Sequence, residues 1–365
     1  LWGMATDALP DDWTILRRWL PVDMQERAWA DGFFQRSRGL HDAELWLRLI
    51  LMHVGGGLSL KQTAVRAREL GLARISSVAL FKRLRRSQRW LQGLTRHLLT
   101  VQQKKLGRFD WPYRYRLRII GASHIQEPGS TGTDWRLHYS IRLPELTCDY
   151  FELTDDQGGE KLGRYPFAAG ELVLVDRGYS HRAGVAHVLE SGAQVLVRWN
   201  PGLFPLRAPG GKALELWPKL RTLREGQTAE QWVEFEWNTK TYRLRLCAVR
   251  KSQLAAQKAL KKARRKAQKN GTQAQAEALE LTGYVLILTS EPTLPLEAVL
   301  ELYRGRWQVE LVFKRLKHLL EVGQVPKYDP ASALAWMQAK ILTALLADRI
   351  LIEGKFFSPW GFTLR

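Results

Sequence analysis

Residues 171–179 read Glu171-Leu172-Val173-Leu174-Val175-Asp176-Arg177-Gly178-Tyr179, a nearly continuous apolar run that ends in an acid. Such a run is typical of a strand that is buried on both faces of a sheet. A second apolar run, residues 193–197, comes after a helix predicted at about residues 182–190. With the strands that precede them, these segments predict a mixed α/β sheet.

Strands are also predicted on both sides of this stretch. Residues 115–120 and 147–153 favour strands, and residues 135–141 alternate strictly. The alternation puts four side chains on one face of that strand, namely Trp135, Leu137, Tyr139 and Ile141. Residues 284–288 bring the chain back into the sheet after a long interruption.

The interruption covers residues 201–282 and begins with structure breakers such as Pro201, Pro205 and Pro209. Residues 232–237 and 242–246 resemble the strands of a hairpin, so we expect a β-rich insertion. Residues 250–269 then contain nine Lys or Arg and no acid. Two interpretations of this basic helix stay open: a solvated face, or a DNA contact through Lys261, Lys262, Arg264 and Arg265.

Residues 1 to about 110 have the apolar period of helices. Ser59 can cap a helix that Gly71 ends, and Ser76 or Ser77 can cap the next helix, which runs to Arg86. The pair resembles a helix-turn-helix whose second helix is basic, although an ordinary solvated helical pair fits nearly as well. A last apolar helix is expected over about residues 332–352.

The formal net charge is +20, which favours a polyanionic partner. Nucleic acids and anionic membrane surfaces are both negatively charged, so either fits. The two cysteines, Cys148 and Cys247, form no disulfide framework or zinc cluster, which fits a reducing cytoplasm. The opening Leu1-Trp2-Gly3 before Met4 looks like an upstream remnant and not a signal peptide. No apolar run is long enough to span a bilayer. Charge alone does not choose between nucleic acid and a membrane surface, and the apolar pattern indicates no membrane span.

A long helix is predicted from about residue 296 to 322, and it carries the most informative side chains. At 100° per residue, one narrow stripe of a straight helix holds Tyr303, Arg306, Glu310 and Lys317. A separate apolar stripe of Val309, Val312, Leu316 and Leu319 can pack on the sheet. A lone acid among cations usually means helical salt bridges, but this set also suits a site for metal and phosphate together. Asp176, just past a buried strand, is likewise placed for metal binding or for an ordinary turn.

These residues resemble the insertion-sequence-four family of DDE transposases. Tyr303, Arg306, Glu310 and Lys317 have the spacing of its Tyr-Arg-Glu-Lys signature, and Asp176-Arg177-Gly178-Tyr179 resembles its second-aspartate motif. Residues 123–136, from Ser123-His124 to Trp135-Arg136, resemble the segment that follows its first aspartate, and the similarity extends from about residue 40 to 350.

The resemblance implies a ribonuclease-H-like core, a β-rich insertion and an N-terminal α-helical domain. It implies that Asp176 and Glu310 are ligands of Mg²⁺, with Mn²⁺ as a substitute, and that Tyr303, Arg306 and Lys317 hold DNA phosphates. Further DNA contacts are expected from Trp307, Lys314, Arg177 and Arg136. The implied reaction is cleavage of a phosphodiester at a transposon end followed by strand transfer into target DNA, within a homodimer that pairs two ends.

One position departs from the family. By the motif, Gly121 stands where the family has its first aspartate, and glycine offers no ligand. His124 and Glu127 are the nearby polar residues; we expect a structural role for His124 and a place beyond the strand for Glu127. The loss of a carboxylate that would bridge both metals should be severe. A catalytically dead, domesticated DNA-binding protein or regulator, and a substitution that traps a DNA complex, therefore remain alternatives to an active transposase.

The domain organisation expected from these patterns has five parts. They are a helical DNA-binding domain (1–110), the first part of the core (111–200), the insertion (201–282), the second part of the core (283–325) and a C-terminal helical segment (326–365). The expected location is the bacterial cytoplasm, in association with the nucleoid.

Overall fold

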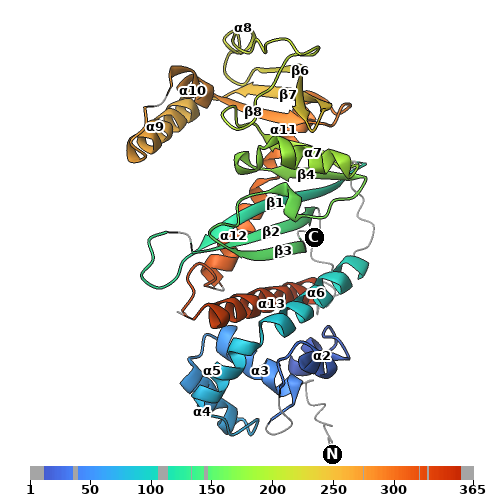
Figure 1. Cartoon of the computed structure of the whole chain (residues 1–365), viewed down its shortest axis with the longest axis vertical. Coiled ribbons are helices and arrows are strands. Elements are labelled where there is room, and N and C mark those ends of the chain that lie inside the picture. Colours follow the sequence, from blue (N-terminus) through green and yellow to red (C-terminus); the bar gives the residue numbers. More distant parts are fainter. Residues whose placement is uncertain are drawn as a thin grey trace, which may run out of the picture.

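The computed structural model describes residues 12–35, 40–105, 114–132, 134–143, 147–273, 275–319, 321–326 and 329–354. The opening Leu1-Trp2-Gly3, Thr133 and the side chain of Leu319 lie outside the described residues. Figure 1 shows an elongated molecule with N-terminal helices at one end, a sheet in the middle, and a hairpin with a projecting helix at the other end.

The sheet has eight strands in the order β3-β2-β1-β4-β5-β8-β7-β6. β1 pairs in parallel with β4, and β4 with β5, while the other neighbours are antiparallel, so the predicted mixed α/β sheet is confirmed. The bounds are β1 (Arg116–Ile125), β2 (Trp135–Leu143), β3 (Thr147–Asp155), β4 (Glu171–Val175), β5 (Gln194–Arg198), β6 (Thr228–Trp237), β7 (Lys240–Arg250) and β8 (Tyr284–Thr289).

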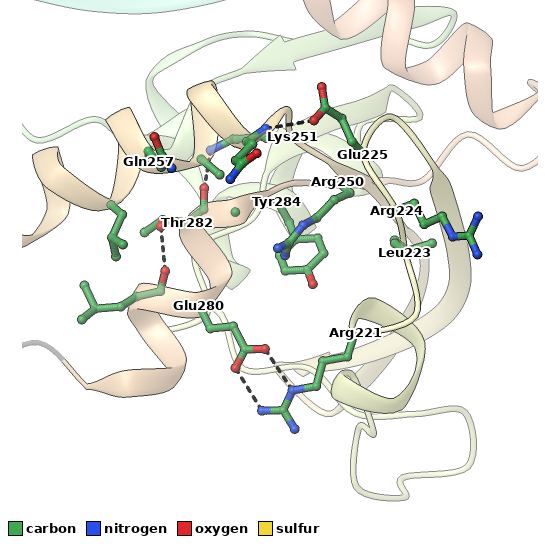
Figure 2. A pocket seen from close by; sticks show the side chains of 15 residues that line it. Arg221, Leu223, Arg224, Glu225, Arg250, Lys251, Gln257, Glu280, Thr282 and Tyr284 are labelled. Atoms are coloured by element: carbon green, nitrogen blue, oxygen red, sulfur yellow. Dashed lines mark hydrogen bonds and ion pairs between the residues drawn. The ribbon is translucent and has the colours of Figure 1, made fainter.

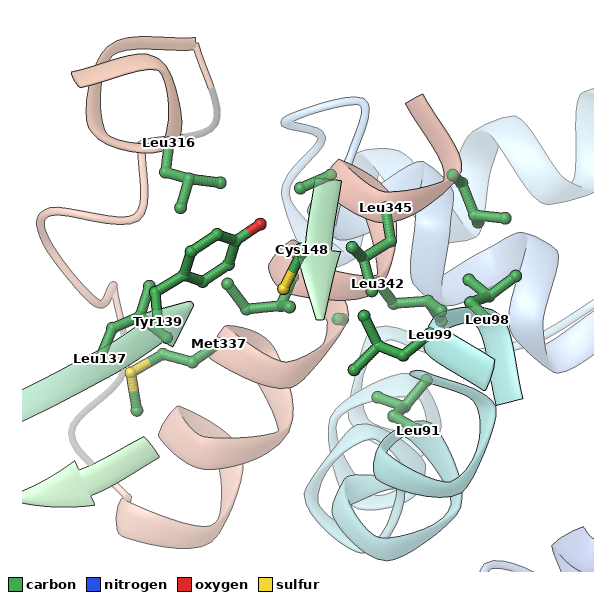
Figure 3. Close-up of a cluster of buried hydrophobic side chains, with 14 of the residues drawn as sticks. Leu91, Leu98, Leu99, Leu137, Tyr139, Cys148, Leu316, Met337, Leu342 and Leu345 are labelled. Carbon is green, nitrogen blue, oxygen red and sulfur yellow. The ribbon is translucent and has the colours of Figure 1, made fainter. Parts of the chain in front are cut away.

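Helices cover both faces of the sheet, which explains why β4 is buried along its whole length. α7 (Arg182–Glu190), which connects β4 to β5, packs on one face with the short turns η1 (Leu162–Arg164) and η2 (Arg177–Tyr179) nearby. The other face carries α12 (Trp307–Leu319), with α13 (Pro330–Gly354) and α6 (Gln88–Lys105) beyond it. Figure 3 shows Tyr139 and Cys148 of the sheet meeting leucines of α6, α12 and α13 in one core. None of the described helices, α13 included, is long and apolar enough to cross a membrane.

The N-terminal helices are α1 (Asp12–Arg17), α2 (Met24–Ala30), α3 (Ala43–Val54), α4 (Leu60–Glu69) and α5 (Ser77–Arg86). Ser59 and Ser76 cap α4 and α5, as predicted, and Gly71 between them has a φ of +65°. The basic residues of α5 differ in their surroundings. Arg83 donates to the carbonyl of Phe33 at 2.7 Å, and Arg85 pairs with Asp329 at 3.2 Å. Lys82 and Arg86 are exposed, and Arg85 is exposed beside its ion pair.

The insertion extends the central sheet, because β7 pairs with β8 along its length. Its other elements are α8 (Trp217–Leu220), α9 (Gln253–Lys269), α10 (Ala276–Glu280) and η3 (Leu281–Gly283). α9 buries none of its side chains and projects from the body in Figure 1. Such exposure suits either a solvated helix or a surface for a polyanion, so both interpretations of the basic run persist.

The predicted long helix is wrong in one respect, because it consists of α11 (Leu296–Arg304) and α12 with a break between them. The amides of Arg306 and Val309 bond to the carbonyls three residues before them, at 3.1 and 3.3 Å, as in a tightened turn. Gly305, at the break, is a poor helix former. A straight-helix stripe therefore does not describe how Tyr303 and Glu310 are arranged, and their positions depend on this turn.

The hairpin turn between β6 and β7 supports a stability prediction. Asn238 and Thr239 have φ values of +46° and +64°, as a two-residue type I′ turn requires. A β-branched residue is strained at positive φ, and glycine is not. We expect Thr239→Gly to stabilise the protein by about 1 kcal/mol, measured as a higher urea midpoint. Thr241→Gly, within β7, is the control and should destabilise; a lower midpoint for Thr239→Gly would contradict the prediction.

Candidate active site

Three residues lie side by side where the parallel strands end. The register pairs Ile120 with Val175 and Val175 with Val197. The residues that follow, Gly121, Asp176 and Arg198, therefore form one row across β1, β4 and β5, here called the strand-end row. Because side chains alternate along a strand, this row faces the side that α12 covers, as Leu174 and Leu196 do.

Gly121 is buried in this row against α12. A Cβ placed on Gly121 would lie 2.9 Å from Cε2 of Phe313 and 3.0 Å from Cγ1 of Val309. Val309 directly precedes Glu310, so a side chain at position 121 would point toward the helix that carries the predicted glutamate. In the Gly121 protein this space is filled by apolar atoms and holds no carboxylate.

Asp176 follows β4 in an extended conformation. Its Oδ1 atom is buried and has no hydrogen-bond partner among the described residues. The hydroxyl of Tyr303 donates to the carbonyl of Val175 at 3.3 Å, beside this carboxylate. Burial, and next the negative charge of Asp176, raise the pKa of Tyr303, so its hydroxyl stays protonated as a donor. A buried polar atom normally has a hydrogen-bond partner, so a carboxylate oxygen without one is suited to bind a metal ion.

Arg306 links Asp176 to Glu310. Its Nη2 donates to Oε1 of Glu310 at 2.6 Å, with side-chain exposures of 15% and 40%. Burial would lower the pKa of Arg306, but the charges of Asp176 and Glu310 raise it overall. The tightened turn before α12 thus brings Tyr303 and Arg306 beside Asp176, and Arg306 pairs in turn with Glu310.

Glu160 is a neighbour of Asp176 that the sequence analysis missed. A Cβ on Gly178 would lie 1.6 Å from Oε2 of Glu160, so the Asp-Arg-Gly segment has room for this carboxylate only because residue 178 is glycine. Burial raises the pKa of Glu160; the charge of Arg136 opposes that shift, and the charge of Asp176 adds to it. The signal in the sequence was Gly158-Gly159-Glu160, which looks like an ordinary loop.

The remaining predicted residues lie at differing distances from this centre. Lys317 is further along α12, near His124. Burial, and next the charges of Arg136 and Lys317, lower the pKa of His124. Trp307 is 55% exposed, and Lys314 is exposed on the same helix. Lys261, Lys262, Arg264 and Arg265 are all exposed on α9, which projects from the insertion in Figure 1.

Two predicted DNA contacts are engaged with the protein itself. Arg136 donates to the carbonyl of Gly158 at 2.7 Å and so holds the loop that carries Glu160. Arg177 donates to Oδ1 of Asn200 at 3.0 Å.

The nearby polar residues do not replace the missing aspartate. Glu127 lies past β1, as expected, and accepts a hydrogen bond from Nε1 of Trp135 at 2.9 Å. His124 is exposed at the end of β1, so it is not a buried core histidine. Within the described ranges, no three His, Cys, Asp or Glu side chains come together as a metal-binding group. Asp176 and Glu310 carry oxygen atoms of the kind that hard divalent cations prefer, and Gly121 offers no side-chain oxygen beside them.

A mixed sheet has an acid after its central strand, and a second acid, an arginine and a tyrosine lie on the covering helices, so the site is that of an α/β protein that can bind cations and phosphate together. The family described as Transposase DDE domain matches residues 154–346, a range that includes Asp176 and Glu310. The chain belongs to the DDE transposases and is a DNA transposase, as its resemblance to the insertion-sequence-four family predicted.

Named relatives agree with this assignment. The chain is 34% identical to "Putative transposase InsL for insertion sequence element IS186A" of Escherichia coli K12, over 96% of both chains. It is equally similar to the transposase for insertion sequence element IS421 of Escherichia coli, again over 96% of both. Among solved structures, piggyBac transposase in a synaptic complex with hairpin DNA aligns with a TM-score of 0.51 at 9% identity, over 98% of this chain and 78% of that one. This likeness supports the ribonuclease-H-like fold. The family implies cleavage and transfer of phosphodiesters with divalent metal ions.

Proposed function

We propose that this chain binds transposon-end DNA at the site around Asp176 but cleaves it poorly, because its strand-end row lacks an acid at Gly121. The observation that carries the proposal is the row itself, in which Gly121 lies level with Asp176. Phosphate binding does not depend on that position. Tyr303, Arg306 and Lys317 come from α11, α12 and the turn between them, and they present a phenol and two cations.

In this proposal Asp176 and Glu310 are ligands of Mg²⁺, with Mn²⁺ as a substitute. Bound ions would supply activation of the attacking water or 3′-hydroxyl and stabilisation of the leaving oxygen. Without metal, the single charge of Arg306 interacts with both carboxylates and offsets part of their repulsion. With cations held by Asp176 and Glu310, the Arg306 guanidinium would be available to a DNA phosphate, for which its planar fork is well suited.

The partners in the proposal are double-stranded DNA of the transposon ends and of the target, with a homodimer in the synaptic complex. The expected location is the bacterial cytoplasm, on the nucleoid. Gly121 also favours a second function, that of an inactive DNA-binding regulator. The test is binding of the element's own terminal duplex against a scrambled duplex of equal length, with Ca²⁺ in place of Mg²⁺. Preferential binding that survives Asp176→Asn supports the proposal, and equal binding of both duplexes contradicts it.

The basic helix α9 gives a separate prediction about affinity. Replacing Lys261, Lys262, Arg264 and Arg265 with glutamine should flatten the dependence of log K on log salt by about one unit per lost phosphate contact. The reason is that each neutralised phosphate releases condensed counterions, and all four side chains are exposed. Titrations at several salt concentrations measure the slope. Exchanging Lys for Arg and Arg for Lys at the four positions keeps the charge and is the control. An unchanged slope in the glutamine variant would make α9 a solvated helix.

A further inference from the structure

Three cations cluster on the insertion side of the catalytic carboxylate, and the sequence analysis singled out only one of them. Arg198 ends β5 next to Asp176 in the strand-end row, and Arg177 follows Asp176. Lys251 lies just past β7, at the start of α9. The charges of Arg198 and Arg177 act on each other and on Lys251, and that of Arg198 also acts on Tyr303.

These cations have no acidic partners at ion-pair distance within the part of the chain that the structure describes. Lys251 donates to the carbonyl of Thr282 at 2.6 Å, and Arg177 to the amide oxygen of Asn200. Both contacts orient the side chains through neutral acceptors, and the acid whose charge acts on Arg177 is Asp176. Burial, and next the charges of Arg198 and Arg177, lower the pKa of Lys251 to about 8. Like charges held together in this way are unfavourable unless an anion completes the site.

The surroundings of Lys251 extend the cluster toward the basic helix. Lys251 is at the wall of an open cavity of about 740 Å³ between α9, η3 and the loop before β6. Figure 2 shows Arg250 and Arg221 on the same cavity, whose acids include Glu280, bound to Arg221 at 2.9 Å. A chain of cations thus runs from Arg198, beside Tyr303, through Arg177 to Lys251 just before α9. A row of several cations suits the repeated phosphates of a nucleic-acid backbone.

From this arrangement we infer that Arg198, Arg177 and Lys251 form a second phosphate-binding track, which holds the DNA backbone between the cleavage point and helix α9. The inference rests on the proposed function, because it takes the strand-end row as the place where DNA is cut. Divalent metals at Asp176 would add positive charge beside Arg198, so the track needs phosphate even more in the loaded enzyme. Arg198 is then a DNA-contacting residue next to the reacting phosphate, and Lys251 is the contact one or more phosphates away.

The experiment measures how each cation couples to individual phosphates. Duplexes of the element's own end carry one neutral methylphosphonate at a time around the cleavage point, and their affinities are measured in Ca²⁺ for the full chain and its variants. Arg198→Gln and Lys251→Gln should each weaken binding of the unmodified duplex about tenfold and lower the salt slope by about one. For each variant, a duplex with the methylphosphonate at one particular position should bind the variant and the parent chain with equal affinity. The position found for Lys251 should lie further from the cleavage point.

The controls separate phosphate binding from folding. Arg198→Lys and Lys251→Arg keep the charge and should retain the salt slope, while Lys212→Gln, an equal charge loss on an exposed loop of the insertion, should leave the coupling pattern unchanged. If no methylphosphonate abolishes the effect of Arg198→Gln or Lys251→Gln, the track is overturned. Tyr303→Phe, Arg306→Gln and Lys317→Gln distinguish failure of the phosphate-binding track from failure of the proposed active site. If these variants couple to phosphates at the cleavage point and Arg198 does not, only the track fails; if none couples, the proposed active site fails as well.

Discussion

Gly121→Asp is expected to restore Mg²⁺-dependent end cleavage, by about 1,000-fold or more over the Gly121 chain. A bridging carboxylate stabilises charge at both metals by several kcal/mol, and each 1.4 kcal/mol in the barrier is a factor of ten in rate. The register supports the position, because residue 121 lies level with Asp176 and points toward the helix of Glu310. The measurement is cleavage of the element's terminal duplex in Mg²⁺ or Mn²⁺.

The added side chain needs space that α12 now occupies. Phe313 and Val309 come within 2.9 and 3.0 Å of the new Cβ, so both must move by a few tenths of an ångström. We therefore expect Gly121→Asp to lower stability without metal, both through this crowding and through repulsion from Asp176. Added metal should then raise the melting temperature of the Gly121→Asp chain by mass action, and the rise should be much smaller for the parent chain.

A matched variant separates the carboxylate from its volume. Gly121→Asn has nearly the same size and the same contacts with Phe313, but it is a poor bridging ligand, so it should bind DNA and stay inactive. Robust cleavage by the Gly121 chain itself would mean that another acid supplies the third ligand, and Glu160, beside Asp176, would then be the first to test. If Gly121→Asp binds DNA normally and still fails to cleave it, that result supports the alternative function of an inactive DNA-binding regulator.

Local patterns predicted much of the fold. The nearly continuous apolar run at 171–175 indicated a strand that is buried on both faces, and β4 is such a strand. Ser59 and Ser76 marked helix starts because their hydroxyls can satisfy free amides, and both do so. The break before α12 was missed, since Tyr303, Arg306 and Glu310 fit a straight helix and only Gly305 indicated otherwise.

The site was harder to predict from the sequence, because it depends on the register between segments that are distant in the chain. Asp176 and Glu310 carry motif signals, whereas Arg198 ends an apolar strand and gains meaning only when Val197 pairs with Val175. Glu160 comes from a glycine-rich loop, and its approach to Gly178 could not be inferred from spacing. Arg136 was expected to be available to DNA, but its hydrogen bond to the carbonyl of Gly158 engages it within the protein.

Glu310→Gln in the Gly121→Asp chain should abolish the restored cleavage, again by about 1,000-fold, while DNA binding changes little. The amide keeps the size of the side chain and removes the charge that a metal requires. Little stability should be lost, because Glu310 is 40% exposed and its contact with Arg306 is a helical pair, which contributes about 0.5 kcal/mol. Arg306, freed from Glu310, stays available to phosphate.

Glu301→Gln is the matched control for this experiment. Glu301 is on α11, pairs with Arg304 at 2.7 Å and is 65% exposed, so the same substitution removes a similar helical ion pair away from Asp176. It should leave cleavage intact. Cleavage is measured under single-turnover conditions, so that product release does not hide the chemical step. If Glu310→Gln cleaves as fast as its parent, Glu310 is only the salt-bridge partner of Arg306, and the second metal ligand must come from elsewhere around Asp176. If both variants lose cleavage equally, the loss comes from the helices that position Tyr303 and Arg306, because a ligand role belongs to Glu310 alone.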